Sequence, residues 1–314
     1  MRVRRAPWDG LAAQAVNGRK RHASCASAKR AVTSAVGARV PWLLIAVPAA
    51  VLLVFFVLPN ALLLSASFLK SEAQELTTTP TLENYAFLFT RRLYLDVFLR
   101  TLLVGLAVGA LDVLFGFPLA YFLVRTRSRF KGLLIALSLA PLLASVVVRT
   151  YGWYIILNRF GVANDALLGL GIIEDRIPFM PSTGAIIVGL AHALLPYAVL
   201  SIMGSLNGIN PNLESAAMSL GANRTRTFFH VVLPLCLPGI AGGFLLVFSI
   251  AISAYATPAI LGGPATQVAA TAIYNFIVVI LDWSLGAALA VVLIVSSLAL
   301  LYAAARVGAN RATL

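Results

Sequence analysis

Few residues of this chain could do chemistry, and they are scattered. Asp112 is the only acid near the middle of a long apolar run, residues 97–124, and His192 lies within another, residues 184–206. A carboxylate in hydrocarbon is costly and usually functional, so Asp112 could face a pathway for a cationic substrate. Its alternative role is to pair with an Arg, a Ser or water between helices. His192 could relay protons, although a bond to a neighbouring helix is the commoner role.

Three aromatic residues, Tyr151, Trp153 and Tyr154, lie near the end of a third apolar run, residues 132–157. Aromatic ring faces attract cations, so these side chains could cradle a cationic group. An aromatic belt at the membrane interface is the alternative, and it is the interpretation that we favour.

The sequence lacks the common motifs for catalysis, nucleotide hydrolysis and metal binding. The sequence contains no GxxxxGK(S/T) phosphate loop, no HExxH, no GxSxG and no Cys/His cluster with metal-ligand spacing. We therefore expect no catalytic residue, metal site or cofactor, and we do not expect the chain to be an enzyme by itself. Its two cysteines, Cys25 and Cys236, fall on the expected cytoplasmic side, where thiols stay reduced.

Membrane helices must position these side chains. The chain has 314 residues, of which 60% are hydrophobic and 11% charged, whereas a soluble domain carries about a quarter charged residues. Six apolar stretches reach the length of about 20 residues that crosses a bilayer. We therefore predict an all-α, polytopic membrane helical bundle of about six transmembrane helices, near residues 42–68, 97–124, 132–157, 184–206, 238–261 and 285–306.

Basic residues predict the orientation of these helices. Nine of the 24 Lys and Arg residues lie in residues 1–39, and four more lie in the short loop 125–131. Basic segments stay on the cytoplasmic side, so we expect both termini there. The predicted organisation is a basic cytoplasmic tail (1–39) near anionic lipid rather than nucleic acid, a transmembrane domain (40–306) and a short cytoplasmic C-terminal tail (307–314).

Two apolar stretches need a separate interpretation. The run from Val40 to Leu69 is too long for the apolar core of a cleaved signal, about 7–15 residues, so we expect a retained helix. Residues 267–281 are short for a span, and they follow Pro258 and Pro264 in a stretch that breaks the fifth span. We expect a surface or half-inserted helix on the outer face, because a seventh span would put the C-terminus outside.

Residues 207–238, between the fourth and fifth apolar runs, predict a helical hairpin on the cytoplasmic side. Asn210 is a good N-cap and Gly221 a natural helix stop. Asn223 then caps a second short helix, which Pro234 and Pro238 are expected to end. A hairpin lying on the bilayer is one interpretation, and a docking element is the other. The residues that form one apolar face on the first helix are Leu213, Ala216, Ala217 and Leu220.

The same segment resembles the cytoplasmic coupling loop of permease subunits of ABC importers, which follows the pattern EAA, three residues, Gly, nine residues, I-x-LP. Ser215, Ala216 and Ala217 occupy the EAA positions, Gly221 follows at the right distance, and VVLP (231–234) ends the pattern. Ser215 replaces the usual Glu and a Val replaces the usual Ile. Glu214, one position earlier, could supply the missing carboxylate.

Further stretches resemble the spermidine/putrescine branch of that family, and the resemblance covers roughly residues 40–306. Permeases for opines, phosphonates and other small charged solutes share these stretches, so they are the alternative. The stretches are GFPLAYFLVR (116–125), VVRTYGWYIILNRFGVAND (147–165), LLPYAVLSIMGSL (194–206), ATPAILGGP (256–264) and DWSLGAALAVVL (282–293).

The resemblance implies a type I ABC importer permease fold in the bacterial inner membrane. It implies three partners: an ABC ATPase subunit dimer, a second permease subunit (a paralogue or a second copy) and a periplasmic solute-binding protein. The residues that it assigns to ATPase docking are Leu213, Glu214, Ser215, Ala216, Ala217, Met218 and Gly221.

The candidate translocation pathway combines Asp112 and Trp153 with the region where the fifth span breaks, at Tyr255, Thr257 and Pro258. Many relatives have an acid where Ala254 stands here, which leaves the solute open. A stand-alone ion-driven transporter is the alternative from another class. It predicts inverted repeats and several intramembrane charges, neither of which the sequence displays.

Overall fold

A computed structural model of the protein describes residues 42–72, 75–126 and 128–312. It divides into two units, residues up to Leu62 and residues from Leu63 onward, which are described separately. The tail 1–39 and Cys25 lie outside the described residues. The first apolar run is helical throughout and comprises α2 (Trp42–Leu52), a π-helical segment η1 (Leu53–Val57) and α3 (Leu58–Ser67).

A small subdomain of one hairpin and one short helix follows α3. It contains the antiparallel hairpin β1 (Leu69–Glu72) and β2 (Glu75–Pro80) and the short helix α4 (Glu83–Thr90). The Asn84 side-chain amide donates to the carbonyls of Ser67 and Leu69 at 3.0 and 2.9 Å. This buried amide fastens α4 to the end of α3 and the start of the hairpin.

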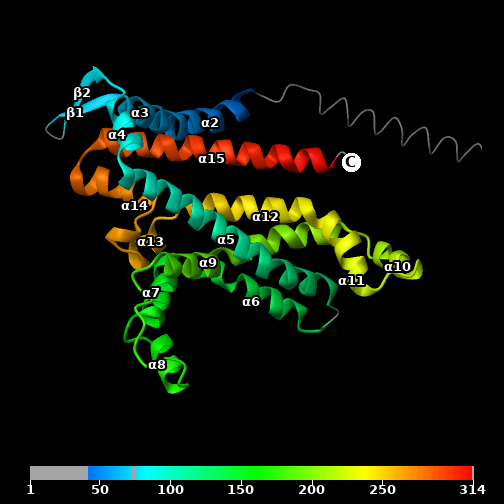
Figure 1. Cartoon of the computed structure of the whole chain (residues 1–314). Coiled ribbons are helices and arrows are strands. Elements are labelled where there is room, and N and C mark those ends of the chain that lie inside the picture. Colours follow the sequence, from blue (N-terminus) through cyan, green and yellow to red (C-terminus); the bar gives the residue numbers. More distant parts are fainter. Residues whose placement is uncertain (1–41, 73–74, 127, 313–314) are drawn as a thin grey trace, which may run out of the picture. The chain divides into compact units, whose positions relative to one another are not determined.

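Three long helices form the centre of the second unit: α5 (Arg92–Arg125), α9 (Thr183–Gly208) and α12 (Leu233–Ser253) (Figure 1). Glycines let them approach closely, because they present no Cβ at the contact. A Cβ on Gly109 of α5 would lie 2.9 Å from the Phe244 ring of α12, and Gly189 of α9 meets Leu261 in the same way. Gly105 and Gly109 of α5 thus form a helix-packing site against α12.

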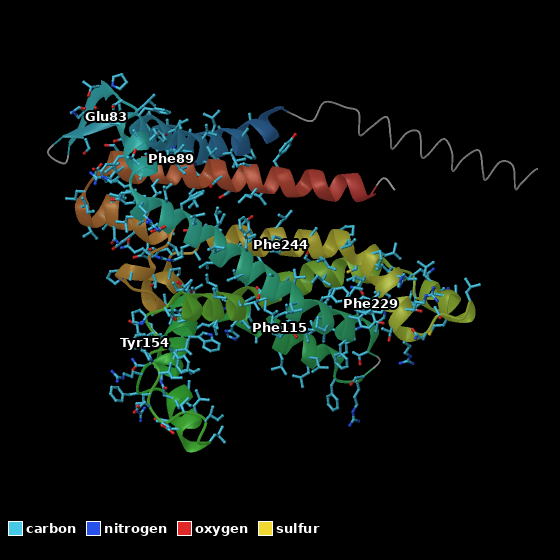
Figure 2. The ribbon with its side chains drawn as sticks, viewed as in Figure 1. Glu83, Phe89, Phe115, Tyr154, Phe229 and Phe244 are labelled. Carbon is cyan, nitrogen blue, oxygen red and sulfur yellow. The ribbon has the colours of Figure 1, made fainter. Side chains whose placement is uncertain are left out.

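Apolar side chains cover much of the outside of these helices as well as their core. Phe115 on α5 is 61% exposed and Phe229 is 55% exposed (Figure 2). Among the described residues, five helical runs are long and apolar enough to cross a membrane, and a bent helix pair counted as one span brings the number to six. The described residues therefore confirm the prediction of about six transmembrane helices.

The third predicted span, residues 132–157, is wrong as a single helix. The chain forms α6 (Lys131–Leu143) and then, after a break at Ala144 and Ser145, α7 (Val146–Leu157), with α8 (Val162–Gly169) beyond it. The segments before and after the break are bent by 95°. Pro141 weakens the last turn of α6 because it lacks an N–H, and its carbonyl accepts a hydrogen bond from the Arg149 guanidinium across the break.

The expected end of the cytoplasmic hairpin at Pro234 and Pro238 is also wrong. The second arm, α11 (Arg224–Thr227), continues through the π-helical segment η2 (Phe228–Val232) into α12 without interruption. A π turn is one of the local adjustments by which a membrane helix accommodates a proline, so the helix continues through Pro234.

The fifth run breaks at Ala254, four residues before Pro258, and the short helix α13 (Ala256–Leu261) follows. Pro258 has no N–H with which to bond the Ala254 carbonyl, which accounts for the position of the break. The predicted break of this span is therefore confirmed, and it begins four residues before Pro258.

Residues 267–281 form a short helix, as predicted, comprising α14 (Ala269–Tyr274) and the π-helical segment η4 (Asn275–Ile280). A 3-10 turn, η3 (Pro264–Thr266), precedes it, and α15 (Trp283–Ala312) follows it. One side of this helix is buried against α5 and α15 through Ala269, Ala272 and Phe276. Its depth in the membrane stays a prediction.

The glycine contact at α5 supplies a test of the packing. We expect Gly105→Leu to lower the thermal unfolding temperature of the purified protein in detergent, because a Cβ at this position would lie 2.5 Å from Ile252 Cγ2. Overpacking of this kind costs about 1–3 kcal/mol. The matched control is Gly132→Leu in α6, where nothing lies within 4 Å. Equal unfolding temperatures for the two variants would contradict the packing described.

Candidate functional site

The short helix α10 (Asn212–Ser219) carries most of the residues predicted to dock on another protein. The Asn210 side-chain oxygen accepts a hydrogen bond from the Asn212 N–H at 3.0 Å. The N-cap residue is Pro211, so the prediction of Asn210 as N-cap is displaced by one residue.

Gly221 ends α10 as predicted. Its φ of +92° is left-handed, its N–H donates to Met218 O at 3.0 Å, and the next N–H, of Ala222, donates to Ala217 O at 3.1 Å. This pair of bonds is the Schellman arrangement, which favours glycine at this position. Asn223 then caps the second arm as predicted, with its side-chain oxygen 2.8 Å from the Arg226 nitrogen.

Glu214 is turned back toward α5, while most other predicted docking residues are exposed. Its carboxylate lies 2.5 Å from the Arg125 guanidinium and accepts a 3.3 Å hydrogen bond from the Tyr121 hydroxyl. Ala217, one turn later, is also partly buried. The exposed members of the predicted set are Leu213, Ser215, Ala216, Met218 and Gly221, and Leu220 beside them is 89% exposed.

Aromatic contacts hold the base of this hairpin. The Phe228 ring, at the start of η2, lies edge-on to Phe117 and Tyr121 of α5, each at 5.5 Å between ring centroids. The hairpin is therefore attached to α5 by an ion pair and by packed rings.

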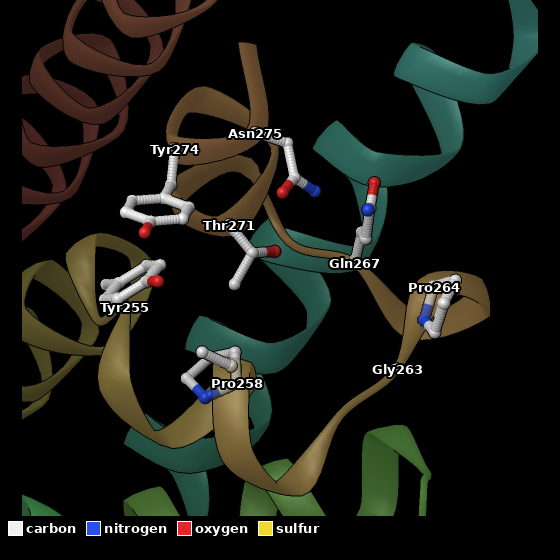
Figure 3. A pocket seen from close by; sticks show the side chains of 9 residues that line it. Tyr255, Pro258, Gly263, Pro264, Gln267, Thr271, Tyr274 and Asn275 are labelled. Carbon is white, nitrogen blue, oxygen red and sulfur yellow. The ribbon is translucent and has the colours of Figure 1, made fainter. Parts of the chain in front are cut away.

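A second feature is a pocket of about 280 Å³ formed by α13, η3 and α14 (Figure 3). The Tyr255 and Tyr274 rings lie side by side at 4.8 Å between centroids. Ring faces attract cations, and amide and hydroxyl oxygens accept hydrogen bonds from ammonium groups. Its nine described lining residues carry no charged side chain, and they are Tyr255, Pro258, Ala259, Gly263, Pro264, Gln267, Thr271, Tyr274 and Asn275.

The sequence reasoning identified two of these lining residues, Tyr255 and Pro258, and missed the polar ones on and before α14. Gln267, Thr271 and Tyr274 recur at helical spacing along an otherwise apolar stretch. That periodicity is the signal that could have found them.

The other predicted pathway residues on α7 and α13 face neighbouring helices. The Thr257 hydroxyl is buried and lies 3.1 Å from the Thr150 hydroxyl of α7. Trp153 Nε1 lies 3.2 Å from His192 Nδ1 of α9 and donates to it. His192 thus has the bond to a neighbouring helix that was the commoner of its two expected roles.

Asp112 is separate from the pocket. It is 1% exposed, and its Oδ2 has no hydrogen-bond partner among the described residues. Gly109 and Gly116, one turn on either side, face Phe244 of α12 and Ala198 of α9. Asp112 therefore lies on the face of α5 that packs against α9 and α12, in an apolar core where an unpaired carboxylate is costly.

Sequence reasoning also missed Arg149. It stands alone in the apolar stretch VVVRTYGWY, and such an intramembrane charge is itself a signal of function or structural need. Its guanidinium bonds the Pro141 carbonyl and so bridges the break between α6 and α7.

Comparisons with known proteins agree with this architecture. The family described as "Binding-protein-dependent transport system inner membrane component" matches residues 112–311. A spermidine/putrescine transport system permease protein, PotB of Salmonella typhimurium, is 34% identical over 243 residues, covering 77% of this chain and 84% of that protein.

Solved structures share the fold. A bacterial ABC transporter involved in the import of the acidic polysaccharide alginate superimposes with a TM-score of 0.69 at 20% identity, covering 86% of this chain and 96% of that one. The same kind of transporter in complex with an alginate-bound periplasmic protein gives a TM-score of 0.68 at 20% identity, covering 84% and 92%.

The break between α6 and α7 supplies a second test. We expect Arg149→Met to lower the thermal unfolding temperature, because a charge-assisted hydrogen bond worth about 1.5–3 kcal/mol is lost. Arg159→Met is the control, since Arg159 is exposed in the loop after α7. The bridging role fails if both variants unfold at the temperature of the unsubstituted protein.

Proposed function

This chain belongs to the family of binding-protein-dependent transport system inner membrane components, and we propose that it is the permease subunit of an ATP-driven importer of polyamines. The family and the apolar helices make it a multi-pass inner-membrane protein. The observation that carries the polyamine proposal is the 34% identity to a spermidine/putrescine permease across three quarters of the chain. ATP hydrolysis is assigned to separate subunits.

The exposed side of α10 is the proposed docking surface for the ATPase subunit. Leu213, Met218 and Leu220 are large apolar side chains that this chain leaves exposed at the tip of the hairpin. A rigid capped helix can transmit force, whereas an irregular loop cannot. We keep for this role the exposed members of the docking set predicted from the sequence, and we assign Glu214 and Ala217 to the inward-facing side of the helix.

Three further assignments belong to the same proposal. A second permease subunit and a periplasmic solute-binding protein complete the importer, and the alginate-bound periplasmic protein in complex with a transporter of the same fold supports the latter. Both termini, the basic tail 1–39 and residues 307–314 are placed in the cytoplasm, on the charge distribution of the sequence. The membrane domain covers residues 40–306.

The pocket beside Tyr255 and Tyr274, called the Tyr255–Tyr274 pocket below, is the proposed binding site for the solute in this subunit. Two ring faces and the oxygens of Gln267, Thr271 and Asn275 suit an alkylammonium group. Ala254 adds no carboxylate beside this pocket, so we assign the counter-charge at the pocket itself to the second permease subunit. Trp153 and Thr257 do not line the pocket, and in this proposal they hold α7 to the neighbouring helices α9 and α13.

Uptake of labelled polyamine tests the whole proposal. The complex, with its ATPase and binding protein, is reconstituted in proteoliposomes and supplied with radiolabelled putrescine or spermidine, with and without ATP. We expect ATP-dependent uptake. If other small charged solutes enter and polyamines do not, the alternative solute class is correct, and uptake driven by an ion gradient alone would establish a secondary transporter.

Gly221→Leu tests the docking helix in the same assay. We expect uptake to fall while the permease remains in the membrane, because a left-handed conformation costs a non-glycine residue about 1–2 kcal/mol and the end of α10 is lost. Gly204→Leu is the control, since Gly204 is helical and has open space around it. Normal uptake and normal ATPase association for Gly221→Leu would refute the assignment of α10.

Asp112 is proposed to meet the cation deeper in the bundle when the helices move apart. The unpaired carboxylate costs stability in the closed core, so Asp112→Asn should retain or raise the thermal unfolding temperature and reduce polyamine uptake. Asp165→Asn in the exposed α8 is the control. If Asp112→Asn changes the unfolding temperature but leaves the uptake kinetics unchanged, Asp112 has a packing role only.

A further inference from the structure

Helix α5 is held by polar contacts near both ends, and these contacts lead to the two sites described above. Near its C-terminus, Arg125 forms the 2.5 Å ion pair with Glu214 of α10. Near its N-terminus, Arg100 donates to the Gln267 carbonyl at 3.1 Å, and the Thr101 hydroxyl accepts from the Ala269 N–H at 2.8 Å.

The Arg125–Glu214 pair is shielded from water. The two side chains are 21% and 18% exposed, and the nitrogen and oxygen that meet are themselves buried. A desolvated charge that loses its partner is strongly destabilising, unlike one in an exposed pair. Because the Tyr121 hydroxyl also donates to Glu214, both contacts of this carboxylate outside α10 lie on α5. A displacement of α10 therefore pulls on α5 rather than breaking the contact.

The contact at the other end positions the pocket. Ala269 is the first residue of α14, whose early N–H groups have no partner within the helix. The buried Thr101 hydroxyl supplies that partner and itself donates to Val97 O at 2.7 Å, which fixes its direction. Gln267 lines the pocket, and Tyr274 lies one and a half turns along α14, so both follow the position of α5.

A single helix joins the two contacts over 24 residues, or about 36 Å at the usual rise. Figure 1 shows α5 running from beside α14 toward the α10–α11 hairpin. Pro118 is the weak point of this helix, because it removes one backbone hydrogen bond. The Phe228 ring packs on Phe117 and Tyr121 on either side of Pro118, which supports the helix there.

We propose that α5 transmits the displacement of α10 to the Tyr255–Tyr274 pocket, with Arg125–Glu214 as the joint at one end and Thr101–Ala269 as the joint at the other. This proposal rests on the importer function proposed above. Its positioning residues connect the helix that docks on the ATPase with the pocket that holds the solute. It makes Glu214 an internal link rather than a contact with the ATPase.

The first test measures solute moved per ATP hydrolysed, with radiolabelled putrescine in the reconstituted complex. We expect Arg125→Gln and Glu214→Gln each to lower this ratio at least about fivefold, the lower end of typical coupling energies. The exchanged pair, Arg125→Glu with Glu214→Arg, should recover much of it. Asp165→Asn is the control, because it breaks the 2.8 Å pair of Asp165 with Arg176 in the α8 region. Unchanged ratios in the single variants, or no recovery in the exchanged pair, would overturn the proposal.

The second test needs no solute, so it stays decisive if polyamines are not transported. Tyr274→Cys, in a protein with Cys25 and Cys236 replaced by Ser, is labelled with a maleimide before and after trapping the ATPase with ATP and vanadate. We expect trapping to change the labelling rate, and we expect Arg125→Gln and Thr101→Val to abolish that change. Thr101→Ser, which keeps the hydroxyl, should preserve it. The same change in every variant would exclude α5 as the link.

If the unsubstituted complex takes up no polyamine, the proposed function is refuted. The labelling experiment would still decide whether α5 links α10 to the pocket, because it does not depend on the solute.

Discussion

The close approach of α5 to α9 and α12 is the constraint on which the rest of the structure depends. In lipid no hydrophobic effect drives helices together, so contact must come from van der Waals packing between backbones. Gly105, Gly109 and Gly116 supply a smooth face on α5 toward these two helices. That face fixes α5 along its length, and so it determines where Asp112 is buried and which helices its two ends can reach.

Breaks in the membrane helices occur where other groups can satisfy the backbone. An unpaired carbonyl or N–H in hydrocarbon costs several kcal/mol, so a helix cannot end there without partners. Arg149 bonds a carbonyl beside the α6–α7 break, and Thr101 bonds the first N–H of α14. Arg149 and Thr101 thus satisfy backbone groups near the ends of α6 and α14, beside the bent span and the pocket.

Local signals in the sequence predicted local structure well. The stop at Gly221 and the cap at Asn223 depend on the conformation of one residue each, and both are confirmed. The bend after Leu143 could not be predicted from hydropathy, because both sides of it are equally apolar. The prediction that Pro234 and Pro238 end the second arm of the hairpin was wrong, because the π turn η2 lets the helix continue into α12. The pocket joins α13 to α14, and its geometry depends on a bond from α5 to Ala269, 168 residues away in sequence.

Because the Glu214 side chain points toward α5, its carboxylate is not available to a partner at the tip of the hairpin. The motif comparison placed a carboxylate at this surface, yet Ser215 is neutral and Glu214 is engaged with Arg125. The large side chains that remain exposed on α10 and directly after it are apolar, namely Leu213, Met218 and Leu220, while the small polar Ser215 is exposed beside them. We propose that an ATPase groove receives α10 chiefly through these apolar side chains and its shape, while the Glu214 carboxylate serves the connection within the permease. Docking and transmission are thereby assigned to opposite faces of one eight-residue helix.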